Sequence, residues 1–268
     1  MYPQINLFGK ILPSYSTLAV IGGVFAYLLI KANKSKRKIN SKALYIMIIL
    51  LIAGMLIGGN LLYNIINFKT ISYVLSNPQI VGGKLKAILI LFNGSIFYGG
   101  LTGAILFSYI YLKIIKEPIK EYFDIISPAI PLFHAFGRVG CFLAGCCYGI
   151  SCDVGFIFTS STIDSANGIR RFPVQLLEAG LCLIIAAIVY LFFVKKILYG
   201  RLIWVYFLLY SIVRFFTEFL RGDNYRGVYG AFSLSQLISI IYFTLSIIYF
   251  AVFFIKKIKT QLKTKHNV

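Results

Sequence analysis

In residues 31–63, KANKSKRKINSKALYIMIILLIAGMLIGGNLLY, a basic segment is followed directly by an apolar one. Six of the first twelve residues are Lys or Arg, whereas residues 43–63 contain no charged side chain. As a helix, residues 43–63 would extend about 31 Å, which matches the hydrocarbon thickness of a bilayer. We therefore expect a membrane-spanning helix that begins directly after a basic linker.

The rest of the chain has the same character. It is 59% hydrophobic and only 13% charged, which is more apolar than a water-soluble protein of this length. Apolar runs long enough to cross a bilayer as helices lie near 12–30, 43–63, 86–112, 122–143, 174–194, 202–220 and 231–255. The prediction is an all-α integral membrane protein, with seven transmembrane helices in a single polytopic domain over residues 1–268.

The basic residues predict the orientation of these spans. Seventeen of the 27 Lys and Arg residues fall in segments that the spans place on one side: 31–42, 113–121, 195–201 and the tail after residue 255. Because positively charged loops stay cytoplasmic, we expect the N-terminus outside and the C-terminus in the cytoplasm. The net charge of +19 follows from this topology, so nucleic acid is not expected as a partner.

Several ionisable side chains fall inside the predicted spans, where a charge costs about 2.5–3.5 kcal/mol on insertion scales. Asp124 lies near a span end and is interpreted as an interfacial charge. Five others are expected to face protein or water and to mark function: His134, Arg138, Glu178, Arg214 and Glu218. Tyr210, Arg214 and Glu218 are spaced four residues apart, so they share one helix face.

Two interpretations of the arginines remain open. Arg138 and Arg214 lie on different helices in the outer half of the membrane, where they suit the phosphate of a lipid headgroup. A guanidinium is always charged and binds phosphate oxygens with two parallel hydrogen bonds. Alternatively, Arg138 pairs with Glu178 and Arg214 pairs with Glu218, as ion pairs with a purely structural role.

Four of the five cysteines lie in HAFGRVGCFLAGCCYGISC, residues 134–152. The spacing of Cys141, Cys146, Cys147 and Cys152 is unusual for zinc, and adjacent cysteines rarely bind one ion together, so no metal is expected. The outward position favours a disulfide between Cys152 and either Cys146 or Cys147. Unpaired packing residues and a redox thiol remain alternatives. Cys182 is expected in the core.

Five segments together resemble the prolipoprotein diacylglyceryl transferase family, in order and over most of the chain. FNGSIFYGGLTGAIL looks like the glycine-rich helix of the family, and PAIPLFHAFGRVGCFLAGCCYG looks like its signature. RRFPVQLLEAGL is similar to its Pro-x-Gln-Leu-x-Glu segment. LLYSIVRFFTEFLRGD is similar to its Tyr-x3-Arg-x3-Glu-x2-Arg helix, and FSLSQLIS to the segment that opens its last helix.

The resemblance implies a cofactor-free enzyme of the bacterial plasma (inner) membrane. Such an enzyme takes phosphatidylglycerol from the outer leaflet and transfers the diacylglyceryl group to the cysteine thiol of a prolipoprotein, which releases glycerol 1-phosphate. By motif position, Arg138 and Arg214 would bind the phosphate and stabilise charge on the leaving group. Tyr210 and Glu218 would position Arg214.

The resemblance also implies two further substrate contacts and shows several departures. Tyr15 matches a tyrosine near the headgroup, and Gly149 matches a signature glycine. Tyr98 stands where the family has the histidine of a His-Gly-Gly motif. An asparagine, a glutamate and an arginine of the family are replaced by Cys141, Cys146 and Asn60.

A thiol must lose its proton before it attacks. Because the family histidine is missing, the residue that accepts this proton is not identified. His134 and Tyr98 are the candidates for this base, and the alternative for His134 is a hydrogen-bonded packing role. A non-catalytic protein that binds or carries phospholipid headgroups is the alternative function. A third hypothesis is a membrane thiol–disulfide protein, although this chain lacks the C-x-x-C spacing that is usual in such proteins.

Overall fold

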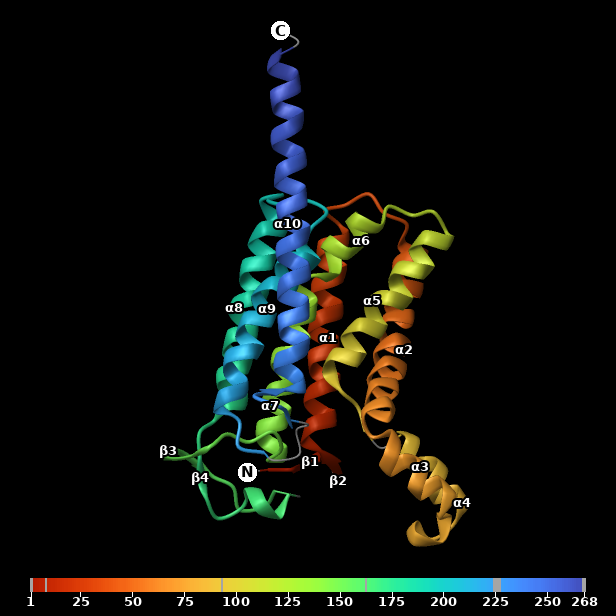
Figure 1. The fold of residues 1–268 in the computed structure, drawn as a ribbon, viewed down its shortest axis with the longest axis vertical. Coiled ribbons are helices and arrows are strands. Elements are labelled where there is room, and N and C mark those ends of the chain that lie inside the picture. The colour runs from red at the N-terminus through yellow and green to blue at the C-terminus, as the bar shows by residue number, and fades with distance from the viewer. Residues whose placement is uncertain (1, 8, 93, 162, 224–227, 267–268) are drawn as a thin grey trace. The chain divides into compact units, whose positions relative to one another are not determined.

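The computed structural model describes residues 2–7, 9–92, 94–161, 163–223 and 228–266 (Figure 1). The α-helices are α1 (Ser14–Lys34), α2 (Ser41–Ile66), α3 (Phe68–Ser76), α4 (Lys84–Leu89), α5 (Phe97–Ile114), α6 (Ile119–Ile126), α7 (Ala129–Ala144), α8 (Val174–Val194), α9 (Leu202–Thr217) and α10 (Leu234–His266). Short antiparallel pairs join β1 (Gln4–Leu7) to β2 (Lys10–Pro13), β3 (Ser151–Ile157) to β4 (Arg170–Arg171) and β5 (Val228–Tyr229) to β6 (Phe232–Ser233).

Within these residues, seven helical segments are long and apolar enough to cross a membrane, which confirms the all-α membrane fold. They are Ser14–Lys34, Ser41–Ile66, Phe97–Ile114, Ile119–Ala144, Val174–Val194, Leu202–Leu220 and Leu234–Leu262. The number of spans and their order agree with the apolar runs of the sequence. The orientation of the termini stays a prediction.

Two spans differ from the sequence-based prediction. The third begins at Phe97, because part of the apolar run that starts at residue 86 forms α4 and a 3-10 turn at Ile90–Phe92. The fourth is interrupted between α6 and α7, where Pro128 precedes the first residue of α7. Proline has no N–H to donate, which explains a break at this point.

The chain packs as two compact units, residues 38–122 and residues 1–37 with 123–268. In the first unit, α2 and α5 approach through glycines spaced four apart on each helix. A Cβ at Gly58 would lie 2.9 Å from the Cα of Gly103, and a Cβ at Gly99 would lie 2.6 Å from the Cβ of Leu62. These glycines therefore allow the two helices to approach closely, as in other membrane helix pairs.

In the larger unit, α1 packs against α7, α7 against α8, α8 against α9, and α9 against α10; Figure 1 shows these helices running alongside one another. At the junction before α9, the carboxylate of Asp124 accepts hydrogen bonds from the backbone N–H of Gly200 at 2.6 Å and of Leu202 at 3.1 Å. These donors belong to a helix start that lacks internal partners. Asp124 thus fixes the position at which α9 begins.

The segment between α7 and α8 is organised by Arg171 of β4. Its guanidinium donates to the carbonyls of Ser165 at 2.5 Å, Ala166 at 3.3 Å and Gly149 at 3.3 Å. It also lies over the ring of Tyr148, 4.1 Å from the centroid. One buried cation therefore holds the loop that continues from the end of α7.

Candidate functional site

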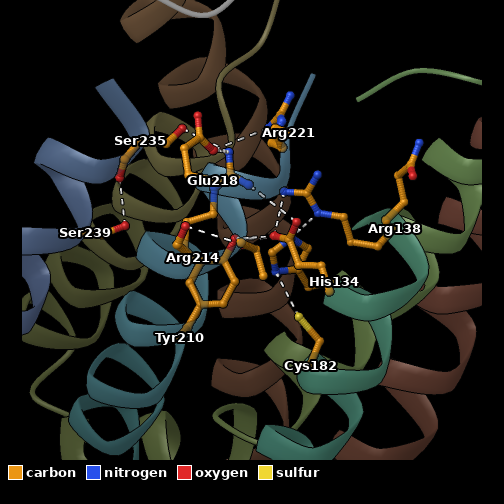
Figure 2. Close-up of polar contacts among 12 residues, drawn as sticks. His134, Arg138, Cys182, Tyr210, Arg214, Glu218, Arg221, Ser235 and Ser239 are labelled. Carbon is orange, nitrogen blue, oxygen red and sulfur yellow. Dashed lines mark hydrogen bonds and ion pairs between the residues drawn. The ribbon is translucent and has the colours of Figure 1, made fainter. Parts of the chain in front are cut away.

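Helices α7, α8 and α9 bring ionisable side chains together inside the larger unit (Figure 2). We call the following residues the charged cluster: Arg138, Glu178, Arg214, Glu218 and Arg221. The first four are only 1% to 7% exposed, and Arg221 is partly buried. Charged groups this deeply buried must be paired, and the pairing defines the site.

Glu178 of α8 lies at the centre of the charged cluster. Its Oε1 is 2.8 Å from Nη2 of Arg138, and its Oε2 is 3.4 Å from Nη1 of Arg214. The hydroxyl of Tyr210 donates to Oε1 at 3.3 Å. Guanidinium groups from two separate helices thus converge on one carboxylate.

Arg214 has further partners on two other segments. Its Nη2 is 2.5 Å from the carboxylate of Glu218, one helical turn later, and donates to Oγ of Ser235 on α10 at 3.0 Å. Figure 2 shows Ser235 and Ser239 facing this side of the cluster from α10. Arg214 is therefore fixed by α8, by the turn after α9 and by α10.

Arg138 is held in a different way. Its Nε donates to Nε2 of His134 at 3.2 Å, and its Nη2 meets Glu178. Because guanidinium nitrogens only donate, His134 Nε2 accepts this bond. Nη1 of Arg138 has no hydrogen-bond partner among the residues that the structure describes. Arg138 therefore keeps one charged donor for a further oxygen.

His134 is enclosed by the cluster and by α8. The sulfur of Cys182 is 3.7 Å from its Nδ1, and the Tyr210 ring packs edge-on at a centroid distance of 4.8 Å. Cys182 is fully buried, which confirms its expected place in the core. These contacts agree with the alternative interpretation of His134, in which it has a hydrogen-bonded packing role and is not the catalytic base.

Arg221 extends the cluster beyond the end of α9. It binds Asp223 with two hydrogen bonds, of 2.9 Å and 2.5 Å, and its Nη1 is 3.9 Å from Glu218. With Asp223 included, three arginines face three carboxylates. The network is formally neutral, which lowers the cost of burying it.

Both ion pairs of the structural alternative are present, Arg138 with Glu178 and Arg214 with Glu218. However, Glu178 also contacts Arg214, so the two pairs form one network. From the sequence, Glu178 was expected to mark function, with Arg138 as a possible partner, but its contact with Arg214 was missed. The signal in the sequence was a glutamate inside an apolar span, four residues after the start of α8.

The remaining expected site residues lie in three different surroundings. Tyr15 packs on α7, where its Cα would be 3.2 Å from a Cβ at Gly140, and its side chain is 48% exposed. Gly149 lies where three backbone segments cross, and a Cβ there would come 3.1 Å from the carbonyl oxygen of Leu220. Tyr98 is buried within the 38–122 unit.

The structure keeps all five cysteines as free thiols, so the bridge expected from Cys152 to Cys146 or Cys147 is not formed. Cys152 is held in β3, where its sulfur donates to the carbonyl of Val154 at 2.6 Å. The sulfurs of Cys141, Cys146 and Cys147 lie instead within 4.8 Å of one another. The physical reason is the tight turn at the end of α7, which folds the chain back over Cys141.

The two loop thiols of this group differ in acidity. Hydrogen bonds from Cys141 and Cys146, followed by the charges of Arg221 and Arg138, hold the pKa of Cys147 well below its ordinary value. The hydrogen bond with Cys141 lowers the pKa of Cys146, but the bond with Cys147 and burial outweigh it and raise that pKa to about 12. Cys147 is therefore the more nucleophilic thiol near neutral pH.

Comparison with known proteins gives matches over nearly the whole chain. A family model described as prolipoprotein diacylglyceryl transferase matches residues 5–252. The phosphatidylglycerol–prolipoprotein diacylglyceryl transferase of Clostridium tetani is 33% identical over 237 residues, which cover 88% of this chain and 90% of the relative. A second relative, named as transferase 2 of Clostridium perfringens, is 32% identical with 88% of both chains covered. One from Campylobacter jejuni is 29% identical, with 94% and 93% covered.

Proposed function

The chain belongs to the prolipoprotein diacylglyceryl transferase family, and from this premise we propose that it transfers the diacylglyceryl group of phosphatidylglycerol to a prolipoprotein cysteine. The thiol sulfur attacks the carbon that joins the diacylglyceryl group to the phosphate, and a carbon–sulfur bond forms. The carbon–oxygen bond breaks, and its electron pair leaves with glycerol 1-phosphate. The thiol proton passes to a base before or during attack.

The observation that carries the proposal is the convergence of Arg138 and Arg214 on Glu178. Two guanidinium groups that reach one carboxylate from opposite helices can also share one phosphate, whose oxygens accept the same charge-assisted bonds. Nη1 of Arg138 has no hydrogen-bond partner among the described residues, and it donates to a phosphate oxygen of the bound headgroup. As the carbon–oxygen bond breaks, negative charge grows on the phosphate, and fixed cations then bind it more strongly.

The other residues of the site hold these arginines in position. Glu178, Tyr210 and Glu218 fix the Arg214 side of the network through the contacts given above. His134 fixes the Nε of Arg138, and this contact favours a positioning role over the role of base. A displacement of about 1 Å in such a site can cost about 100-fold in rate, so these contacts matter for transfer.

The substrates define where the site operates. We assign the enzyme to the bacterial plasma membrane as a multi-pass protein, with its N-terminus outside and its C-terminus in the cytoplasm. Phosphatidylglycerol enters from the outer leaflet, and the prolipoprotein thiol arrives from the same side. Tyr15 and Gly149 contact the headgroup region in this assignment, and Tyr98 occupies the place of the family histidine.

A transfer assay tests the proposal. Purified protein in lipid nanodiscs receives phosphatidylglycerol labelled in its glycerol backbone and a peptide that carries a lipobox cysteine. We expect labelled thioether and an equal amount of glycerol 1-phosphate from wild type, and at least about 100-fold less from Arg138→Ala. Arg170→Ala, an exposed arginine on β4, is the matched control and should retain wild-type activity.

Two results would contradict the proposal. Tight binding of phosphatidylglycerol without release of glycerol 1-phosphate would favour the headgroup-binding alternative. Equal activity of Arg138→Ala and Arg170→Ala would show that transfer does not depend on the charged cluster.

A further inference from the structure

Three cysteine sulfurs gather at the C-terminal end of α7, outside the contacts used by the transfer reaction. Cys141, Cys146 and Cys147 place their sulfurs within 4.8 Å of one another, and all three are free thiols. We propose that these residues form a binding site for one thiophilic metal ion of the Zn²⁺ type, held by three thiolates. This inference goes beyond the transfer reaction and does not depend on it.

The backbone at the end of α7 builds this arrangement. Gly145 follows the helix in a left-handed conformation (φ 77°), and the N–H of Cys146 bonds to the carbonyl of Cys141 at 3.1 Å. Cys147 is also left-handed, with φ 55°, although it is not glycine. A left-handed residue with a side chain costs about 1–3 kcal/mol and is found mostly where function requires it. In this conformation the sulfur of Cys147 lies close to the sulfurs of Cys141 and Cys146.

The distances suit a metal with thiolate ligands. Zinc–sulfur bonds of about 2.3 Å place the ligands of a tetrahedral ion about 3.8 Å apart. Sulfurs that already lie within 4.8 Å need to move by less than about 1 Å to reach that spacing. Three protein ligands leave the fourth position to water, a pattern known from open zinc sites.

The loop that carries two of the ligands is fixed from both sides. Gln175 of α8 donates to the carbonyl of Cys146 at 2.8 Å, and Ser161 donates to the carbonyl of Gly145 at 3.1 Å. Outer contacts of this kind orient metal ligands and raise affinity. The site is therefore held in shape before an ion arrives.

The surroundings also favour the charge of the complex. Three thiolates and one Zn²⁺ carry a net charge of –1, and the nearby cations Arg138 and Arg221 interact electrostatically with these cysteines. The sequence argued against zinc because the cysteine spacing is unusual and adjacent cysteines rarely bind one ion together. In the structure Cys147 is left-handed, and the sulfurs of both adjacent cysteines lie close to that of Cys141.

Metal binding by the intact protein tests the proposal. Protein purified without oxygen, reduced and treated with a chelator is titrated with Zn²⁺ alone, and bound zinc is counted after removal of excess metal. We expect one ion per chain. With Co²⁺ in place of zinc, a sulfur-to-cobalt charge-transfer band should report three thiolate ligands in the unmodified protein. This second readout needs no substitution, so it does not depend on whether a variant folds.

Single variants then identify the ligands. Cys146→Ser and Cys147→Ser should each weaken zinc binding by more than about 100-fold, since the loss of even an outer contact costs 10–100-fold. Cys152→Ser is the matched control and should bind as wild type does. No stoichiometric zinc, zinc retained equally by all variants as an adventitious ion only, or a disulfide within the trio in the freshly isolated protein would each overturn the proposal.

Discussion

Replacing Glu178 by glutamine gives the sharpest perturbation of the charged cluster, because it keeps the size of the side chain and removes its charge. Arg138 then loses its carboxylate, whereas Arg214 keeps Glu218 at 2.5 Å. The substitution therefore leaves one buried guanidinium without a counter-charge, close to a second one. We expect a loss of stability and of transfer activity together.

The size of the effect follows from the two distances. Contacts of 2.8 Å and 3.4 Å correspond to about 5–6 kcal/mol each at an effective dielectric constant of 20. Desolvation of the buried carboxylate offsets several kcal/mol of this attraction. Breaking one partner of a buried ion pair is known to cost about 3–5 kcal/mol, and we expect a loss of that size in the free energy of unfolding.

The assay is reversible unfolding in mixed micelles, followed for Glu178→Gln, Arg138→Gln and the double variant. The double variant should lose at least about 1 kcal/mol less than the sum of the single variants, because neither then leaves an unpaired charge. Asp153→Asn, at an exposed carboxylate on β3, should stay within about 0.5 kcal/mol of wild type. A loss of less than about 1 kcal/mol in the free energy of unfolding for Glu178→Gln, with additive effects in the double variant, would show that Glu178 does not link the two arginines.

His134, the contact between α2 and α5, and the cysteine group give three further predictions. His134→Gln keeps a hydrogen-bond acceptor, so the pH profile of transfer should stay unchanged with a rate loss below about 10-fold; loss of about 100-fold or more together with one limb of the profile would restore the base role. Gly58→Ala should cost about 1–3 kcal/mol in unfolding free energy because its Cβ meets the α5 backbone. Gly23→Ala, on a helix face with no atom within 4 Å of the new Cβ, should cost nothing, and equal losses at both sites would contradict the packing. After chelation, Cys147 should be alkylated at lower pH than Cys146, because its pKa is lowered and that of Cys146 is raised to about 12; peptide mass spectrometry would contradict this by finding equal rates at every pH.

The spans were predictable from the sequence because a bilayer requires a fixed length of apolar helix. The start of the third span was not, because apolar composition alone cannot distinguish a spanning helix from the short α4 and the turn at Ile90–Phe92. Similarly, the two prolines of the fourth span were visible, but only the structure assigns the break to the residues before α7.

The site was predictable as far as single helices determine it. The four-residue spacing placed Tyr210, Arg214 and Glu218 on one face of α9 and the turn that follows it. Arg214 and Glu218 belong to the charged cluster, and Tyr210 donates a hydrogen bond to Glu178 of that cluster. The bridge by Glu178 depends on the packing of α7 against α8 and of α8 against α9, which no local pattern encodes. The thiol group depends on a left-handed backbone at Cys147, which residue type gave no reason to expect.

Arg138 and Arg214 are proposed to bind one lipid phosphate together. An experimental structure of the protein with phosphatidylglycerol bound in a bilayer would show whether both guanidinium groups contact the same phosphate. We expect the phosphate oxygens to accept hydrogen bonds of about 2.7–2.9 Å from both guanidinium groups, with Nη1 of Arg138 among the donors. A headgroup bound elsewhere, with both arginines still in their contacts with Glu178 and Glu218, would show that they do not bind the phosphate.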